Sequence, residues 1–138
     1  MLKNWLLEDM AKSKKKIILI IEDDEVILRA LYLSFHEGEF TIATATDGET
    51  GLNMTRRLKP DLVLLDLILP KMNGFDYLKD MKADQELAHI PVIVLSNLGS
   101  EENKTKVKES GALDYFVKSD TDLSVLVKKV KHVLEKSP

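Results

Sequence analysis

The chain contains no cysteine among its 138 residues. Disulfides, zinc–thiolate sites and cysteine nucleophiles are therefore excluded, and a reducing compartment such as the cytoplasm is the expected location. No apolar run approaches the ~20 residues that span a bilayer, and Glu8 and Asp9 interrupt the apolar patch near the N-terminus, so we predict neither a signal peptide nor membrane insertion. The formal net charge is -3, which gives no support for direct nucleic-acid binding.

The residues that are present suit one domain of ordinary size, since 44% of them are hydrophobic. We expect this domain at 16–138, after an N-terminal appendage at 1–15. Apolar residues between Leu2 and Met10 recur at roughly helical spacing. The appendage is either a short helix lying on the domain or a docking element for a partner or a second copy.

Short apolar runs alternate with helical stretches along the domain. Strands are expected at 17–21, 40–44, 61–65, 91–95 and 114–117. Helices are expected at 25–36, 47–58, 73–82, 100–110 and 121–135. This order predicts an α/β fold with a doubly wound, five-stranded parallel sheet and helices on both faces. The chain ends just after the fifth helical stretch, and no second domain is expected.

Chemically active side chains stand at four of the expected strand ends. They are Glu22 and Asp23, Asp66, Ser96 and Lys118. In a doubly wound sheet these ends share one edge, which is where ligands bind. Carboxylates this close are costly unless a cation neutralises them, and oxygen ligands without histidine or cysteine favour Mg²⁺. Each residue alone has an ordinary explanation as a cap or a solvated side chain, but together they meet the needs of phosphoryl transfer, with Asp66 as the best-placed nucleophile.

Four segments in combination carry a family resemblance: IIEDDE, LLDLILPKMNGFDYL, VIVLSN and GALDYFVKS. Together they resemble the receiver domain of bacterial two-component response regulators, over residues 16–136. The resemblance implies a flavodoxin-like sheet with strand order 2-1-3-4-5. It also implies a phosphorelay protein of the stand-alone, chemotaxis-regulator type, which is not an enzyme in its own right but assists its own phosphorylation and dephosphorylation.

The resemblance assigns roles around the acceptor. Asp66 would take a phosphoryl group from a sensor histidine kinase or a phosphotransfer protein. Asp23 and Asp66 would bind Mg²⁺ directly, Glu22 would act through water, and the backbone carbonyl of Ile68 would be a further ligand. Lys118 would pair with the phosphoryl oxygens.

The resemblance also assigns a switch. Ser96 would follow the phosphoryl group and Tyr115 would change its side-chain position on activation, while Gly74 would give the loop after Asp66 its backbone freedom. The segment at 100–110 holds little apolar surface, so we expect it to be mobile. We expect an unidentified output protein, with an acidic surface, to bind the lysine-rich face at 100–135.

Two positions depart from the family pattern. Ser119 follows Lys118, where the family usually has a proline with a cis bond, and a cis bond before a residue other than proline costs roughly 2.5–4 kcal/mol. Asn97 follows Ser96, where a small residue is common, and its side chain is expected to narrow access or add a hydrogen bond.

Three alternatives compete with this interpretation. A phosphatase of the haloacid dehalogenase type would need a second acid two residues after Asp66, where Ile68 stands. An FMN carrier would need a phosphate-binding loop after the first strand, where this chain has acids that repel phosphate. A degenerate receiver that no longer takes phosphate is disfavoured by the complete set of acids, hydroxyl and lysine.

Overall fold

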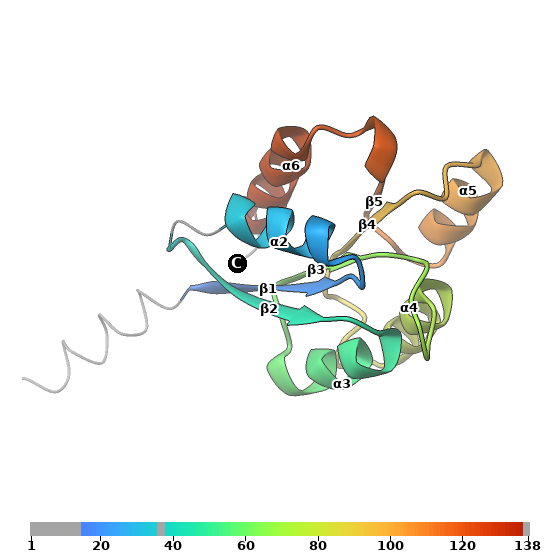
Figure 1. Cartoon of the computed structure of the whole chain (residues 1–138). Helices are drawn as coiled ribbons and strands as arrows, with labels where there is room; N and C mark the ends of the chain where they lie inside the picture. Colours follow the sequence, from blue (N-terminus) through green and yellow to red (C-terminus); the bar gives the residue numbers. More distant parts are fainter. Residues whose placement is uncertain (1–14, 36–37, 137–138) are drawn as a thin grey trace, which may run out of the picture.

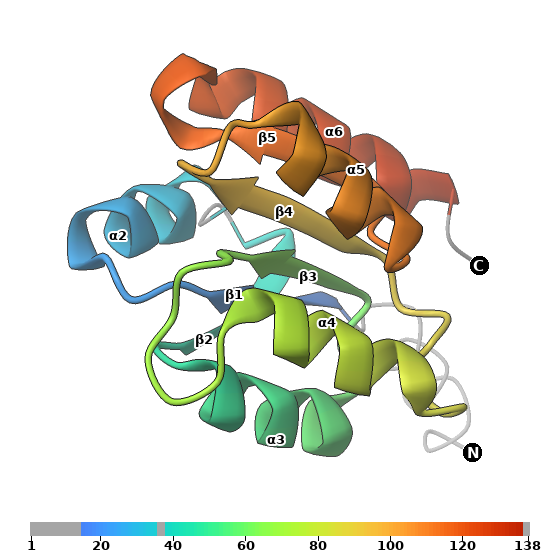
Figure 2. The same cartoon turned by 90° about the vertical axis from the view of Figure 1, so that its right-hand side faces the viewer.

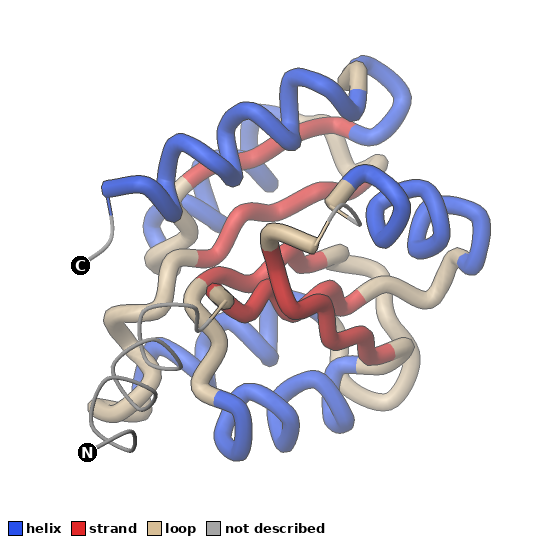
Figure 3. The backbone as a smooth tube through the Cα atoms, turned by 90° about the vertical axis from the view of Figure 1, so that its left-hand side faces the viewer, coloured by secondary structure: helices blue, strands red, loops and turns tan. Residues whose placement is uncertain are grey.

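The computed structural model describes residues 15–35 and 38–136 of the chain, and the expected appendage at 1–15 lies outside the described residues except for its last position. Five parallel strands form one sheet in the order β2-β1-β3-β4-β5, which confirms the expected fold and strand order. Figure 3 shows the strands side by side with helices on both sides. The strands are β1 (Lys16–Ile21), β2 (Phe40–Ala45), β3 (Leu62–Leu65), β4 (Val92–Ser96) and β5 (Asp114–Val117).

The helices cover the two faces of the sheet unequally. They are α2 (Glu25–Ser34), α3 (Gly48–Leu58), α4 (Gly74–Ala83), α5 (Glu101–Glu109) and α6 (Leu123–Lys136), with a short 3-10 helix, η1 (Lys118–Asp120). Figures 1 and 2 show α2 and α6 on one face and α3, α4 and α5 on the other. In the part of the chain that the structure describes, none of the helices has the length and apolar character needed to cross a membrane.

The alternation of side chains along β1 divides the core into two layers. Ile18 and Ile20 pack in the layer that includes the buried side chains of α2 and α6, whereas Leu19 and Ile21 pack in the layer under α3, α4 and α5. β1, β3 and β4 lie in the interior of the sheet, so their side chains are buried in one or the other of these two layers. Their nearly unbroken apolar sequences follow from burial on both faces.

Short polar side chains fix where the helices begin. Asp24, Asp47, Asn73 and Ser100 each stand at an N-cap and accept a hydrogen bond from a backbone N–H of the first turn. The observed starts therefore agree with the expected ones to within one residue for α2 to α5. The expected last helix, at 121–135, begins two residues later, at Leu123, because η1 follows β5 and the Asp122 carboxylate accepts from the Ser124 N–H at 2.9 Å.

A buried hydrogen bond joins α3 to α4. The hydroxyls of Thr55 and Tyr77 are 2.8 Å apart, and neither residue is exposed to solvent. Thr55 donates its own proton to the Gly51 carbonyl at 2.7 Å, so the Tyr77 hydroxyl is the donor between the two. Because a buried hydroxyl without a partner costs about 1–3 kcal/mol, this pair fixes how the two helices lie against each other.

We expect α5 to be much less protected than α6. It buries only Val107, whereas α6 buries Leu126, Val130 and Leu134. Each buried aliphatic side chain contributes about 1.5–3 kcal/mol, and helices in proteins depend mainly on such burial. In amide hydrogen exchange, residues 101–109 should therefore exchange much faster than residues 123–136. Equal protection of the two helices would contradict this expectation.

Candidate functional site

The acidic residues meet at one edge of the sheet because the strand ends are hydrogen-bonded in register. The Glu22 N–H donates to the Ala45 carbonyl at 2.9 Å, and the Asp66 N–H donates to the Ile21 carbonyl at 3.0 Å. Glu22 is 2% exposed and Asp66 is 6% exposed, while Asp23 faces solvent. Carboxylate oxygens of the three acids lie within 4.8 Å of one another, a spacing that can hold a metal ion.

Lys118 supplies the positive charge among these acids. It is the first residue after β5, and its Nζ lies 2.6 Å from Glu22 Oε1 and 2.9 Å from Asp66 Oδ2. Burial lowers the pKa of the ammonium, but the hydrogen bonds to Glu22 and Asp66 outweigh it and leave the pKa above its ordinary value. The lysine is therefore charged, and with three carboxylates beside one ammonium the cluster still favours a further cation.

Burial disfavours the ionised form of Glu22. Burial raises its pKa from 4.5 to about 7, against the lowering effect of its hydrogen bonds with Lys118 and the Asp24 N–H. The neighbouring charge of Asp66 adds to the rise. Glu22 Oε2 accepts the Asp24 N–H at 3.1 Å, so both oxygens of this carboxylate have a partner.

The loop from β3 to α4 leaves the site directly after Asp66. Its far end returns at Gly74, whose N–H donates to the Leu67 carbonyl at 2.9 Å. A Cβ at Gly74 would lie 2.4 Å from the Asp66 carbonyl oxygen, so only glycine fits there. This close approach keeps the loop in a tight turn, with the Ile68 N–H 3.4 Å from Asp66 Oδ1 and the Ile68 side chain 58% exposed.

The two expected switch residues lie on neighbouring strands and contact the same loop. Ser96 is the last residue of β4, is fully buried, and accepts the Leu98 N–H at 3.4 Å. Tyr115 on β5 is also buried, and its hydroxyl donates to the Leu98 carbonyl. Burial, followed by the charge of Asp66, raises the pKa of Tyr115, so the phenol is neutral and remains a donor.

The two positions that depart from the family pattern lie at the rim of the site. Every peptide bond among the described residues is trans, which includes the bond between Lys118 and Ser119. Asn97 and Ser119 are both exposed, so neither fills the buried part of the cluster.

Comparison with known proteins identifies the family. A family profile described as "Response regulator receiver domain" matches residues 18–131. The chain belongs to the response regulator receiver family. Receiver domains are signalling modules of two-component phosphorelays rather than classical enzymes, and they interact with histidine kinases, phosphotransfer proteins and output domains. The chain is homologous to phosphorylatable response regulators.

Individual relatives agree with this assignment. The chain is 34% identical over 120 residues to the DNA-binding dual master transcriptional regulator RpaA of Synechocystis, covering 87% of the chain but only 49% of RpaA. It is 32% identical over 117 residues to PilH of Pseudomonas aeruginosa, covering 85% of the chain and 96% of PilH. The structure of the Mn²⁺-bound response regulator Rcp1 superposes with a TM-score of 0.76 at 27% identity, covering 89% of the chain and 97% of Rcp1.

The structure thus places the strand-end residues of the receiver in two groups. Glu22, Asp23, Asp66 and Lys118 form the charged cluster, and the two expected switch residues both hydrogen-bond with the Leu98 backbone. Sequence reasoning did not find the direct ion pair between Lys118 and Glu22. Nothing in the local sequence indicates it, because the two residues are brought together only by the sheet.

The raised pKa of Glu22 predicts how the metal-free receiver responds to pH. The folded state holds the Glu22 proton more tightly than the unfolded chain, so the contribution of Glu22 to stability falls as pH rises from about 4.5 to about 7 and is level above that. At pH 8, Glu22→Gln should raise the free energy of unfolding, by on the order of 3 kcal/mol at 1.36 kcal/mol per pKa unit.

The measurement is urea unfolding in a chelator between pH 4.5 and pH 8. Glu86→Gln is the control, because the Glu86 side chain is 74% exposed and its removal should leave the pH profile unchanged. A Glu22→Gln profile that keeps the slope of the wild type over this pH range would show that Glu22 is not the titrating group.

Proposed function

We propose that Asp66 is the phosphoryl acceptor of this receiver. The observation that carries the proposal is the position of the Lys118 ammonium, which contacts both Asp66 and Glu22 inside a cluster of three carboxylates. An Asp66 oxygen forms a bond to the donor's phosphorus while the bond from phosphorus to the donor histidine's nitrogen breaks, leaving an acyl phosphate. Lys118 would neutralise the phosphoryl oxygens, which is the main demand of phosphoryl transfer.

The donor set of the cluster fits Mg²⁺. Only oxygen ligands are present, and such a set suits hard divalent cations. Asp23 and Asp66 would bind directly, Glu22 would bind through water, and the Ile68 carbonyl would complete the protein ligands. When bound, Mg²⁺ supplies charge neutralisation for the carboxylates and the phosphoryl oxygens. The Mn²⁺-bound form of Rcp1 supports a divalent cation in this family.

We infer that Ser96 and Tyr115 transmit the modification to α5. Both contact the backbone of Leu98, in the loop that leads from β4 to α5, and α5 has only one buried apolar residue to hold it in place. A new hydrogen bond at Ser96 would therefore compete with few packing contacts. A histidine kinase or phosphotransfer protein would be the donor, and a protein that binds the face at 100–135 would be the reader.

The lysines on this face are not a uniform basic surface. Lys104 pairs with Glu101 at 3.5 Å, Lys129 pairs with Asp114 at 3.5 Å, and Lys106 Nζ lies 4.4 Å from the centre of the Phe75 ring. Exposed pairs of this kind contribute about 0–1 kcal/mol, so an acidic partner can exchange with them at little cost. We therefore keep the face at 100–135 as the proposed binding surface for the output protein, and we expect these pairs to break when it binds.

Phosphorylation by a small acyl-phosphate donor tests the acceptor directly. We expect the protein with Mg²⁺ to gain one phosphoryl group by intact mass, and Asp66→Asn to gain none, because it removes the nucleophilic oxygen. Asp80→Asn is the matched control, since Asp80 is an exposed acid on α4 and should be modified like the wild type. Modification of Asp66→Asn to the same extent as the wild type would refute the assignment.

We also expect a long-lived acyl phosphate. The side chains of Ile68 and Leu98, each two residues beyond a site residue, can neither donate nor accept a hydrogen bond, so neither orients an attacking water. Ile68→Asn and Leu98→Glu should each speed the loss of phosphate several-fold, measured by intact mass after removal of the donor.

The control is Leu33→Asn on α2. Leu33 has the same 58% exposure as Ile68, but it lies outside the site, so its replacement should not change the decay. Decay rates equal to those of the wild type in both site variants would mean that these two positions do not limit hydrolysis.

A further inference from the structure

The first turn of α3 lies directly against the loop that follows Asp66. The Gly48 N–H points to the Pro70 carbonyl at 3.4 Å, and the same carbonyl accepts the Met72 N–H at 2.8 Å. A Cβ at Gly48 would lie 1.8 Å from the Met72 carbonyl oxygen and 2.7 Å from its carbon. Because these are backbone atoms, no side-chain rotation can make room, and either the loop or the helix would have to move.

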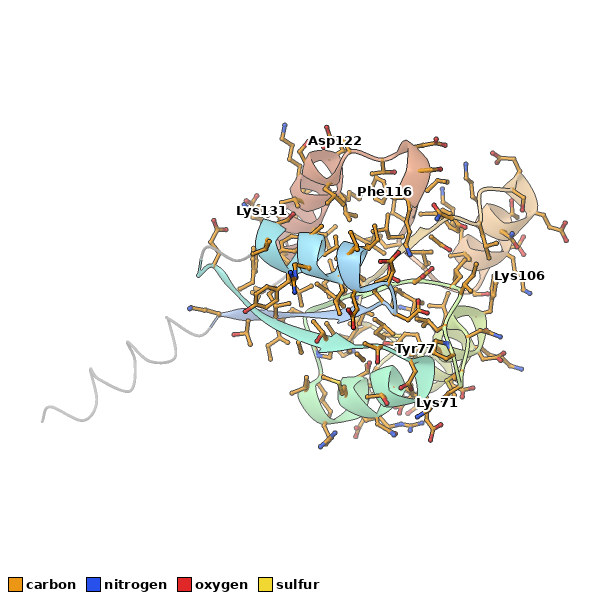
Figure 4. The ribbon with its side chains drawn as sticks, in the orientation of Figure 1. Lys71, Tyr77, Lys106, Phe116, Asp122 and Lys131 are labelled. Carbon is orange, nitrogen blue, oxygen red and sulfur yellow. The ribbon has the colours of Figure 1, made fainter. Side chains whose placement is uncertain are left out.

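The helix is held firmly at this point. The Asp47 carboxylate accepts the Thr50 N–H at 2.7 Å and the Thr50 hydroxyl at 2.9 Å, which closes the first turn of α3. These hydrogen bonds lower the pKa of Asp47, with a further contribution from the charge of Lys71. Farther along, the buried bond between Thr55 and Tyr77 ties the helix to α4. Figure 4 shows Lys71 and Tyr77 on the α3 side of the sheet.

The loop is the part that can yield. The loop ends at Gly74, which packs against the Asp66 and Leu67 backbone. Within the loop, Lys71 has a left-handed backbone with φ 66°, which is unfavourable for a residue other than glycine. Ile68, whose carbonyl is the proposed ligand, lies inside this held stretch. A displacement at Met72 therefore passes along a short, constrained segment to the carbonyl beside Asp66.

We infer that Gly48 is a positioning residue of the phosphorylation site: the absence of a side chain there sets the path of the loop that carries the Ile68 carbonyl. The inference rests on the proposed function, because it takes that carbonyl as a ligand for a divalent cation. Gly48 touches none of the reacting groups and acts only through the loop backbone.

A second glycine in the same helix provides a matched control. A Cβ at Gly51 would lie 2.6 Å from the Ile21 Cδ1 atom, so alanine there crowds a side chain in the core. Gly51 is buried and helical like Gly48, but it faces β1 and not the loop. Gly51→Ala should therefore cost stability without displacing the loop.

The experiment measures Mg²⁺ affinity by calorimetry and thermal stability in a chelator for both variants. We expect Gly48→Ala to weaken Mg²⁺ binding by about 10-fold or more, the usual effect of disturbing the support of a ligand. Gly51→Ala should lower the melting temperature and bind Mg²⁺ like the wild type. The amide NMR signals of residues 67–72 should shift in metal-free Gly48→Ala and stay in place in Gly51→Ala.

A double variant that combines Gly48→Ala with Lys71→Gly tests the inference if Gly48→Ala alone does not fold. Glycine at 71 accepts the left-handed backbone without strain and lets the loop adjust, so the double variant should fold and recover part of the Mg²⁺ affinity. Wild-type affinity in Gly48→Ala, or an equal loss of affinity in Gly51→Ala, would overturn the inference.

Different results would contradict the proposed function. If the wild type neither binds Mg²⁺ nor accepts a phosphoryl group, the proposed function is wrong and the inference falls with it. If the wild type does both and Gly48→Ala matches it, only the inference is overturned.

Discussion

The site depends on one charge arrangement: a lysine ammonium held between two buried carboxylates. Lys118 lies 2.6 Å from Glu22 and 2.9 Å from Asp66, and both acids are almost fully removed from solvent. Buried carboxylates whose oxygens lie within 4.8 Å of each other repel and lose hydration, and the ammonium between them offsets part of this cost. The sheet makes the arrangement possible, because it brings the ends of β1, β3 and β5 to the same edge.

Much of this could be predicted from the sequence, because the relevant signals are local. The unbroken apolar runs of β1 and β3 indicate strands buried on both faces, and polar residues at their ends must then lie at one edge of a parallel sheet. The capping residues Asp47, Asn73 and Ser100 are equally local, since each acts on N–H groups of the turn that follows it. The strand order was implied by the family resemblance and not by periodicity.

The contacts that sequence reasoning did not find are all set by how distant elements dock. In the sequence, Gly48 is an ordinary residue near the start of a helix, and only the structure shows that the Met72 carbonyl lies against it. Thr55 and Tyr77 are 22 positions apart, and their hydrogen bond depends on the distance between two helices. Lys106 looked like part of a free basic face, yet it lies over the Phe75 ring. Composition and spacing do not contain these distances.

The same charge arrangement explains why modification of one aspartate would be felt elsewhere. A phosphoryl group on Asp66 would bring additional anionic oxygens to Lys118, which already serves Glu22, so the partners of a single ammonium would have to be redistributed. The Leu98 backbone is hydrogen-bonded to both Ser96 and Tyr115, so a change at either side chain acts on the loop that leads from β4 to α5. Beyond it lies α5, in which Val107 is the one buried residue, so a weakly packed helix directly follows this loop. A rigid charged cluster beside a weakly packed helix is what a phosphorylation switch requires, since a few kcal/mol at the cluster can then change the population of the helix.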